Sequence, residues 1–174
     1  GDGDMDVLVA SYMGNTILWY ENTDGQGTFS TQKVILTNTN YAYSVYATDI
    51  DGDGDIDVLS ASHDDDKIAW YENTDGQGTF STQKTISTQA DGATSVYAAD
   101  LDGDGDMDVL SASASDNKIA WYENTDGQGT FSTQKTITTQ AVWALSVYAA
   151  DIDGDGSLDV LSASDNDKKI AWYE

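Results

Sequence analysis

The chain has no cysteine, no proline and no arginine, and it contains a single histidine. Without cysteine, disulfides and thiolate metal sites are excluded, and the redox compartment is left open. The seven lysines stand against 31 acidic residues, which gives a formal net charge of −24. This balance argues against nucleic acid and anionic membranes as partners, since both are bound through Lys and Arg. No apolar run approaches the roughly 20 residues of a membrane-spanning helix, so membrane insertion is not expected.

What the chain has in abundance is aspartate in a repeated pattern. The Asp/Gly segment Asp49–Asp57 recurs as Asp100–Asp108 and again as Asp151–Asp159, with a constant spacing of 51 residues. Residues 73–123 and 124–174 are identical at 41 of 51 positions. A constant period of this length indicates a repeated structural unit. The repeat array covers residues 1–174, and its parts are a partial blade 1–21 followed by repeats 22–72, 73–123 and 124–174.

Each repeat has the pattern of four short strands. In the first complete copy, strands A, B, C and D are expected at residues 44–48, 58–62, 67–72 and 79–86. Strand C carries apolar side chains on both faces, which suits a sheet packed between two other sheets. No stretch shows a helical period, and 16 glycines punctuate the turns. The pattern predicts an all-β fold, a β-propeller of four-stranded antiparallel blades with about 51 residues each.

The loop between strands A and B carries carboxylates at positions 1, 3, 5 and 9, counted from Asp49. Ca²⁺ takes six to eight oxygen ligands and tolerates irregular geometry, so this donor set favours calcium. Position 7 holds Asp55, Asp106 or Ser157, as expected where the backbone carbonyl is the ligand. The candidate metal residues are Asp49, Asp51, Asp53, Asp55 and Asp57 in the first complete loop, Asp100, Asp102, Asp104, Asp106 and Asp108 in the second, Asp151, Asp153, Asp155, Ser157 and Asp159 in the third, and Asp2, Asp4 and Asp6 in a truncated loop.

Three other interpretations of the loop compete with this one. A calcium β-roll requires nonapeptide Gly-Gly repeats, which this chain lacks. An EF-hand requires Glu at position 12, where this chain has Ser60, Ser111 and Ser162, and the flanking segments are strand-like rather than helical. A solvated Asp/Gly hairpin that binds no metal is the remaining alternative. The repetition of the same four ligand positions in three copies favours a Ca²⁺ site in each complete loop.

These residues resemble the FG-GAP/VCBS-type repeats of integrin-like β-propellers. The family's motif, Asp-x-Asp-x-Asp-Gly-x-x-Asp, is matched by Asp49, Asp51, Asp53 and Asp57 and by their counterparts in the next two repeats. The resemblance implies a calcium loop between the first two strands of each blade. Members of the family include adhesion receptors, lectins and domains attached to secreted enzymes, so the resemblance implies an extracellular or cell-surface protein without fixing its ligand.

Strand order places the A–B and C–D loops at one end of each blade and the B–C and D–A loops at the other. The first end is nearly invariant among the repeats, whereas copies that agree elsewhere diverge at the second end, which we call the variable face. Rigid scaffolds usually place recognition on such loops. We expect Tyr41, Tyr43 and Trp143 to bind a carbohydrate or a cell-surface protein there. The alternative is that these aromatics fill gaps between blades.

The strand count predicts an incomplete ring. Fourteen strands are expected, and the first blade lacks strand A while the last lacks strand D. Because propellers need four to eight closed blades, we expect the ring to be completed by a homo-oligomer or by a longer parent chain. The leading function is a non-enzymatic, calcium-stabilised binding or adhesion module. A scaffold without a small ligand is the alternative, and a carbohydrate-active enzyme is a remote one, because a single His and no Arg leave little catalytic chemistry.

Removal of calcium is expected to lower the melting temperature markedly. Metal affinity contributes to folding free energy wherever a site exists only in the folded state. The measurement is a thermal melt in calcium and in excess chelator at neutral pH, with magnesium as the control cation. A melting curve that chelation leaves unchanged would contradict the calcium assignment.

Overall fold

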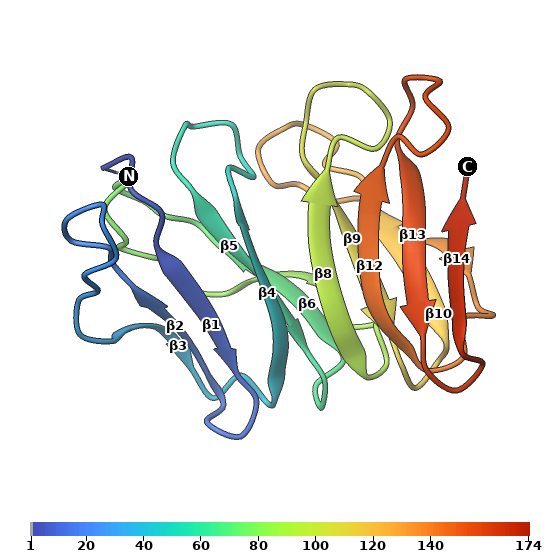
Figure 1. Cartoon of the computed structure of the whole chain (residues 1–174), viewed down its shortest axis with the longest axis horizontal. Coiled ribbons are helices and arrows are strands. Elements are labelled where there is room, and N and C mark those ends of the chain that lie inside the picture. Colours follow the sequence, from blue (N-terminus) through green and yellow to red (C-terminus); the bar gives the residue numbers. More distant parts are fainter. Residues whose placement is uncertain (1) are drawn as a thin grey trace.

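A computed structural model describes residues 2–174. Over these residues the chain forms fourteen strands in four antiparallel sheets that stand side by side (Figure 1). The all-β prediction is confirmed. This described part of the chain contains no helix long and apolar enough to cross a membrane. In spatial order the strands are β1 (Val7–Ser11), β2 (Thr16–Tyr20) and β3 (Lys33–Thr37); β4 (Ala42–Thr48), β5 (Asp57–Ser62), β6 (Lys67–Tyr71) and β7 (Lys84–Ser87); β8 (Ala93–Ala99), β9 (Asp108–Ser113), β10 (Lys118–Tyr122) and β11 (Lys135–Thr138); and β12 (Ala144–Ala150), β13 (Asp159–Ser164) and β14 (Lys169–Tyr173).

Strands A, B and C lie where the sequence pattern placed them, within two residues at each end. The start of strand D was predicted wrongly, because β7 begins at Lys84 rather than at residue 79. In the intervening segment Phe80 forms only an isolated bridge with Asn73. The Ser81 amide donates to the Glu72 carbonyl over 2.7 Å, and the Ser81 hydroxyl accepts from the Glu72 amide over 3.0 Å. The side chain thus replaces a ladder hydrogen bond and delays the regular strand.

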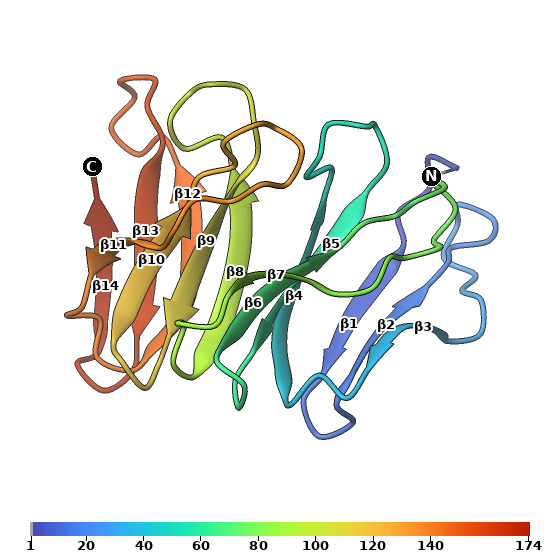
Figure 2. The ribbon, with the colours of Figure 1, turned by 180° about the vertical axis from the view of Figure 1, so that it is seen from behind.

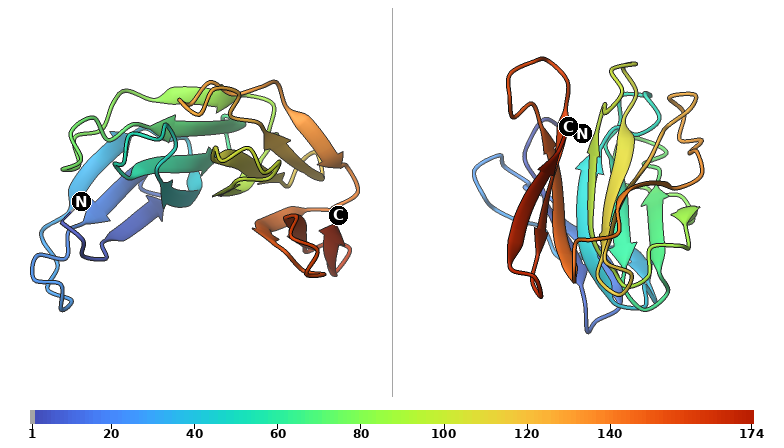
Figure 3. Two further views of the ribbon diagram at one scale, coloured as in Figure 1. Left: turned by 90° about the horizontal axis from the view of Figure 1, so that it is seen from above. Right: turned by 90° about the vertical axis from the view of Figure 1, so that its right-hand side faces the viewer.

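The four sheets follow one another along an open arc, with the two chain ends at its two extremities (Figure 3). The outer strands β3, β7 and β11 are seen from behind in Figure 2. The first sheet has the order β1-β2-β3 and the last β12-β13-β14, so within residues 2–174 the first lacks strand A and the last lacks strand D, as predicted. No closed ring forms from the described residues. The blades are therefore propeller-like, and the two terminal sheets expose one face each.

Three hydrophobic clusters join neighbouring sheets. The cluster between the second and third sheets contains Leu59 and Trp70 on one side and Val109 and Tyr122 on the other, all nearly or fully buried. The cluster between the third and fourth sheets uses the same positions, and the cluster between the first and second sheets uses three of them, Leu8, Val58 and Tyr71. Strand β6 is buried on both faces, whereas Trp172 of the terminal strand β14 is 48% exposed because no sheet packs against it. The apolar strand pattern thus stabilises the protein through sheet-to-sheet contact.

Two of the three interfaces contain a tryptophan packed on a glycine. A Cβ added to Gly129 would lie 2.3 Å from Cζ2 of Trp70, and one added to Gly78 would lie 2.3 Å from Cζ2 of Trp19. Each glycine belongs to the C–D turn of the sheet that follows the tryptophan. Trp19 and Trp70 therefore pack between neighbouring sheets. Both glycines have positive φ, so two separate constraints select glycine here.

Alanine substitutions can separate the effect of the positive φ from the effect of packing against tryptophan. Gly27 has the same turn position, a φ of +97° and no atom within 4 Å of an added Cβ, whereas Gly129 meets Trp70. We expect Gly27→Ala to cost about 1–2 kcal/mol for the left-handed backbone. Gly129→Ala should cost about 1–3 kcal/mol more, because it also overpacks the interface. Denaturant unfolding of the two variants measures the difference, and equal losses would contradict tryptophan packing as the reason for glycine.

Candidate metal centre

The three complete acidic loops connect strand A to strand B in successive sheets, and all lie at the same end of the sheets, at the top in Figure 1. They join β4 to β5, β8 to β9 and β12 to β13. Each begins where a strand with a partly buried face ends, and Gly residues with positive φ at positions 4 and 6 let the chain reverse tightly. The sheets therefore present three copies of one turn in the same orientation.

Carboxylates shape each loop from within. Asp49 accepts hydrogen bonds from the amides of Gly52 (2.8 Å) and Gly54 (3.0 Å), and Asp53 accepts from Asp55 (2.8 Å). The second and third loops repeat all three contacts at similar distances. A carboxylate oxygen has more than one lone pair, so these hydrogen bonds leave acceptor capacity on the same atoms. The fold of the loop thereby orients several carboxylates toward a common point.

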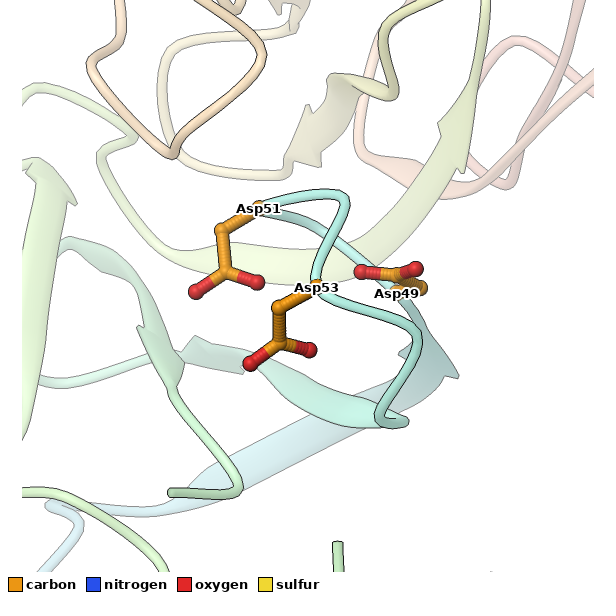
Figure 4. Close-up of side chains that lie close together, drawn as sticks. All are labelled: Asp49, Asp51 and Asp53. Atoms are coloured by element: carbon orange, nitrogen blue, oxygen red, sulfur yellow. The ribbon is translucent and has the colours of Figure 1, made fainter. Parts of the chain in front are cut away.

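Three carboxylates in each loop come close enough to share a cation. Oxygen atoms of Asp49, Asp51 and Asp53 lie within 4.8 Å of one another. Figure 4 shows these three side chains on their loop. The corresponding group in the second loop is Asp100, Asp102 and Asp104, whereas in the third loop Asp151 and Asp153 group with Asp159 of position 9 in place of position 5. A further group in the third loop contains Asp153, Asp155 and Glu174. Glu174 was missed from the sequence, because nothing in the loop spacing places the last residue of β14's sheet beside the loop.

An unpartnered oxygen in the first loop tests whether the residues fit a cation. Oδ1 of Asp51 is buried and, among the described residues, has no hydrogen-bond donor. Burial raises the pKa of Asp51, and the neighbouring charge of Asp53 raises it further. Burying a carboxylate without a donor is costly, and a divalent cation removes that cost. An all-oxygen, multiply charged donor set with an unsatisfied member therefore fits a hard divalent metal ion.

Position 9 has a different environment from positions 1, 3 and 5. Asp57 is 1% exposed and accepts from the amides of Ile50 (3.0 Å) and Asn73 (2.8 Å). Burial raises its pKa to about 6 despite those two hydrogen bonds, and burial raises the pKa of Asp108 to about 6 in the same way. The side chain joins the start of the loop to the C–D turn. In the third loop, the corresponding Asp159 also belongs to the carboxylate group.

The side chain at position 7 lies apart from the cluster. A Cβ added to Gly76 would lie 2.4 Å from Oδ1 of Asp55, and Gly127 stands in the same relation to Asp106. These carboxylates therefore pack against the C–D turn, and neither belongs to a carboxylate group within the described residues. This placement is compatible with a ligand role for the backbone carbonyl at position 7, which remains a prediction together with Ser157.

Family profiles match the chain as FG-GAP-like repeats over residues 1–60, 49–111 and 108–162. The chain belongs to the FG-GAP-like repeat family. These matches cover all three complete loops.

Two solved structures are similar to this FG-GAP-like chain. The crystal structure of the V. cholerae biofilm matrix protein Bap1 has a TM-score of 0.51 and 24% identity, covering 100% of this chain and 28% of that one. A functionally unknown protein from Desulfotomaculum acetoxidans DSM 771 has a TM-score of 0.44 and 11% identity, covering 97% of this chain and 65% of that one. The chain thus spans about a quarter of the first and two thirds of the second. No curated protein matches it. The first similarity shows a shared fold.

The truncated FG-GAP-like loop keeps part of the same geometry. Asp2 accepts from the amide of Asp4 (3.1 Å), as position 5 does in complete loops, and Asp6 accepts from the amide of Asn22 (2.8 Å), as position 9 does. Asp4 packs against Gly25, as position 7 packs against its turn. Among the described residues these three carboxylates do not form a close group. Metal binding at this loop remains a prediction.

On the variable face the structure groups two of the three predicted ligand-binding aromatics. Tyr41 and Tyr43 lie with Tyr12, at ring-centroid distances of 4.6 and 5.6 Å from it, and Tyr43 lies 6.1 Å from His63. Trp143 is 42% exposed and stands two repeats away, without a ring contact to this cluster. Tyr12 was missed as a cluster member, although its position in the divergent B–C turn was a usable signal.

The backbone of the variable face is fixed by contacts between successive sheets. The Asn15 side chain accepts from the Tyr41 amide (2.9 Å), Asp66 accepts from Gly92 (2.9 Å), and Asn117 accepts from Trp143 (2.9 Å). The carbonyls of the same three D–A residues then accept from amides of the following B–C turn. The φ values of Tyr41, Gly92 and Trp143 are 64°, 65° and 61°, so one left-handed position carries a tyrosine, a glycine and a tryptophan.

Acidic pH is expected to stabilise the metal-free protein. The pKa of Asp57 and Asp108 is about 6 in the fold against an ordinary 3.8, so the folded chain holds protons that the unfolded chain has lost. This contribution is complete below about pH 4 and is lost as the pH rises through about 6.

In chelator, thermal melts should therefore show a melting temperature that falls between pH 4 and pH 7, whereas saturating calcium should reverse the trend by favouring the ionised carboxylates. The double variant Asp57→Asn, Asp108→Asn provides the control, and its melting temperature in chelator should lose this pH dependence. A wild-type melting temperature that rises over the same interval in chelator would contradict the assignment.

Proposed function

We propose that the chain is a non-enzymatic, calcium-stabilised extracellular binding module of the adhesion type. Calcium holds the constant end of the sheets rigid, and the variable face binds a glycan or a cell-surface protein. The observation that carries the first part is the repeated group of three carboxylates around each loop. The observation that carries the second is the bulky aromatic residue held at a left-handed backbone position in two repeats.

The donor chemistry supports calcium over other metals. In the first loop Asp49, Asp51 and Asp53 would hold the ion, with Asp57 behind them and the position 7 carbonyl as a further donor. No sulfur is available, because the chain has no cysteine, and the lone His63 lies on the variable face. Hard oxygen donors suit Ca²⁺, and extracellular modules of this kind bind it at roughly 10⁻⁴–10⁻³ M. The ion's role would be structural, since it neutralises carboxylates that otherwise repel one another.

Backbone strain supports a binding role for the variable face. Gly92 adopts its φ of 65° without cost, whereas Tyr41 and Trp143 hold nearly the same φ against the clash of their own Cβ. Bulky residues in this region are uncommon, and strain of this kind collects at functional sites. Exposed aromatic faces stack on sugar rings and anchor protein partners. The acidic surroundings disfavour polyanionic ligands, which favours neutral glycans among the carbohydrates.

The extracellular placement rests on composition, family and fold together. Calcium loops of millimolar affinity are filled in calcium-rich surroundings outside cells. The FG-GAP-like family includes adhesion proteins, and the structurally similar Bap1 is a biofilm matrix protein. The clustered carboxylates of this chain belong to the repeated loops, so few acidic groups remain to form an asymmetric active site. These features favour a binding module over an enzyme.

Replacing Trp143 by glycine separates a binding role from a packing role. Because Gly92 shows that glycine fits this position, Trp143→Gly should relieve about 1–2 kcal/mol of backbone strain and raise the melting temperature. Tyr41→Gly should be nearly neutral, since it also loses the contact with Tyr12. Wild type and both variants are then compared on a glycan array and in pull-downs from cell-surface extracts, with calcium present.

Loss of binding together with unchanged or higher stability supports the proposal. A clear fall in melting temperature for Trp143→Gly would show that the tryptophan fills a gap between blades. If both variants still bind, the binding site lies elsewhere on the chain. If the wild-type chain binds neither glycans nor proteins, the scaffold interpretation is favoured.

A further inference from the structure

Three tyrosines form a row that crosses two successive sheet interfaces. Tyr46, Tyr97 and Tyr148 occupy the same place in β4, β8 and β12, at the constant spacing of 51 residues. Neighbouring ring centroids lie 4.8 and 4.6 Å apart, and the ring planes are tilted by 54° and 46°. Aromatic pairs in proteins usually have centroids about 4.5–7 Å apart, so both pairs lie at the close end of that range. We call these three residues the tyrosine row.

The strands that carry the tyrosine row are held against one another by contacts between sheets. They lie on the side of the arc that faces the viewer in Figure 1, away from the outer strands β7 and β11. The Val96 amide donates to the Ser44 hydroxyl of the preceding sheet over 3.3 Å, and the next interface repeats this contact. The Thr94 hydroxyl donates to the Ala144 carbonyl of the following sheet over 2.7 Å. The scaffold thereby positions the rings, and positioned groups react as if at a high local concentration.

The hydroxyl groups of the tyrosine row are not used by the scaffold. In strand C, by contrast, the Tyr71 hydroxyl lies 3.2 Å from the Ser60 hydroxyl and accepts from Gln83 over 3.0 Å. Among the described residues, no serine, glutamine or backbone group hydrogen-bonds to a hydroxyl of the row. Burial raises the pKa of Tyr97, and the neighbouring phenols raise it further. Phenylalanine would fill the same space, so the hydroxyl that all three repeats carry is available for phenol chemistry.

We propose that the tyrosine row is a site of oxidative cross-linking, at which a haem peroxidase and hydrogen peroxide join neighbouring tyrosines into dityrosine. Each of two phenols loses one electron and one proton, and the two phenoxyl radicals form a carbon–carbon bond between their ortho carbons. The two ortho hydrogens then move to the phenol oxygens, which restores both aromatic rings. Hydrogen peroxide takes up the two electrons and two protons, and its O–O bond breaks to give two molecules of water.

A bond in the tyrosine row would supply a covalent link between sheets. The chain has no cysteine, so it cannot form a disulfide there. Each bond would join residues 51 positions apart across one sheet interface. As with a disulfide, closing a loop of this length disfavours the unfolded chain. Because the array is stabilised by contacts between neighbouring sheets, a bond at this place would hold two sheets together and fix the curvature of the arc.

The test treats the whole chain, dilute and with calcium present, with a haem peroxidase and hydrogen peroxide. Cleavage after lysine separates the row, because Tyr97 is the only tyrosine of residues 85–118, Tyr148 is the only one of residues 136–168, and Tyr46 lies in residues 34–67. Mass spectrometry should find the first of these peptides joined to each of the other two, with the loss of two hydrogen atoms per link. The product should run as a monomer under denaturing conditions, and its melting temperature should rise by about 10 °C.

Phenylalanine variants assign the links, since they keep the ring and its packing. Tyr97→Phe should abolish both links and the rise in melting temperature, whereas Tyr46→Phe should abolish only the link to residues 34–67 and Tyr148→Phe only the link to residues 136–168. Tyr20→Phe is the matched control and should keep both links, because Tyr20 has no aromatic ring contact among the described residues.

Two side reactions are distinguished by the same measurement. Coupling within the aromatic cluster around Tyr12 would join residues 1–33 to residues 34–67, and methionine oxidation adds oxygen instead of removing hydrogen. A wild-type chain that gives only these products, or that forms dityrosine only between chains, would overturn the proposal. Links to residues 85–118 that survive in Tyr97→Phe would overturn it as well.

Discussion

The repeated unit depends on the hydrogen bonds that the buried position 9 carboxylate accepts. Asp57 is buried at the junction of strand A, strand B and the C–D turn, and its two oxygens hold an amide from the loop and an amide from the turn. Two hydrogen bonds offset part of the cost of burying a charge, yet burial still raises the pKa to about 6. A nearby positive charge would stabilise the ionised form of this buried carboxylate, and this chain has few lysines to provide one. A cation bound in the loop, as proposed above, would therefore couple the fold of each sheet to metal binding.

That coupling extends from one sheet to the next. The Asn124 side chain donates to the Ile50 carbonyl over 2.9 Å, so the C–D turn of the third sheet holds the acidic loop of the second. Ile50 itself is buried between the same two sheets, close to Trp70. A cation bound in the proposed loop site would therefore also act on this interface. Stability in such an array comes from nearest-neighbour contacts, so each loop influences the sheet that follows it.

The sequence predicts those features of the structure that depend on local residue pattern and spacing. Period, strand pattern and loop spacing led to the sheets, their order and the grouping of Asp49, Asp51 and Asp53, because these depend on local alternation and repetition. It was uninformative where contacts are not local. The late start of β7 depends on a hydroxyl that replaces a ladder bond, and the position of Glu174 beside the third loop depends on sheet pairing. The aromatic cluster around Tyr12 depends on how two sheets meet.

The two ends of the sheets differ in what the repeats keep constant. The acidic-loop end keeps its side chains as well as its backbone, whereas the variable face keeps only its backbone. At the variable face the backbone at Tyr41, Gly92 and Trp143 is held by an Asn or Asp of the preceding sheet and by an amide of the following turn. None of these contacts uses the side chain at the position itself. Two hydrogen bonds, worth roughly 1 kcal/mol each, are enough to hold an aromatic residue in a left-handed conformation that costs about 1–2 kcal/mol. The scaffold therefore accommodates tyrosine, glycine and tryptophan at this position with one backbone conformation, so the side chain can change there without altering the fold.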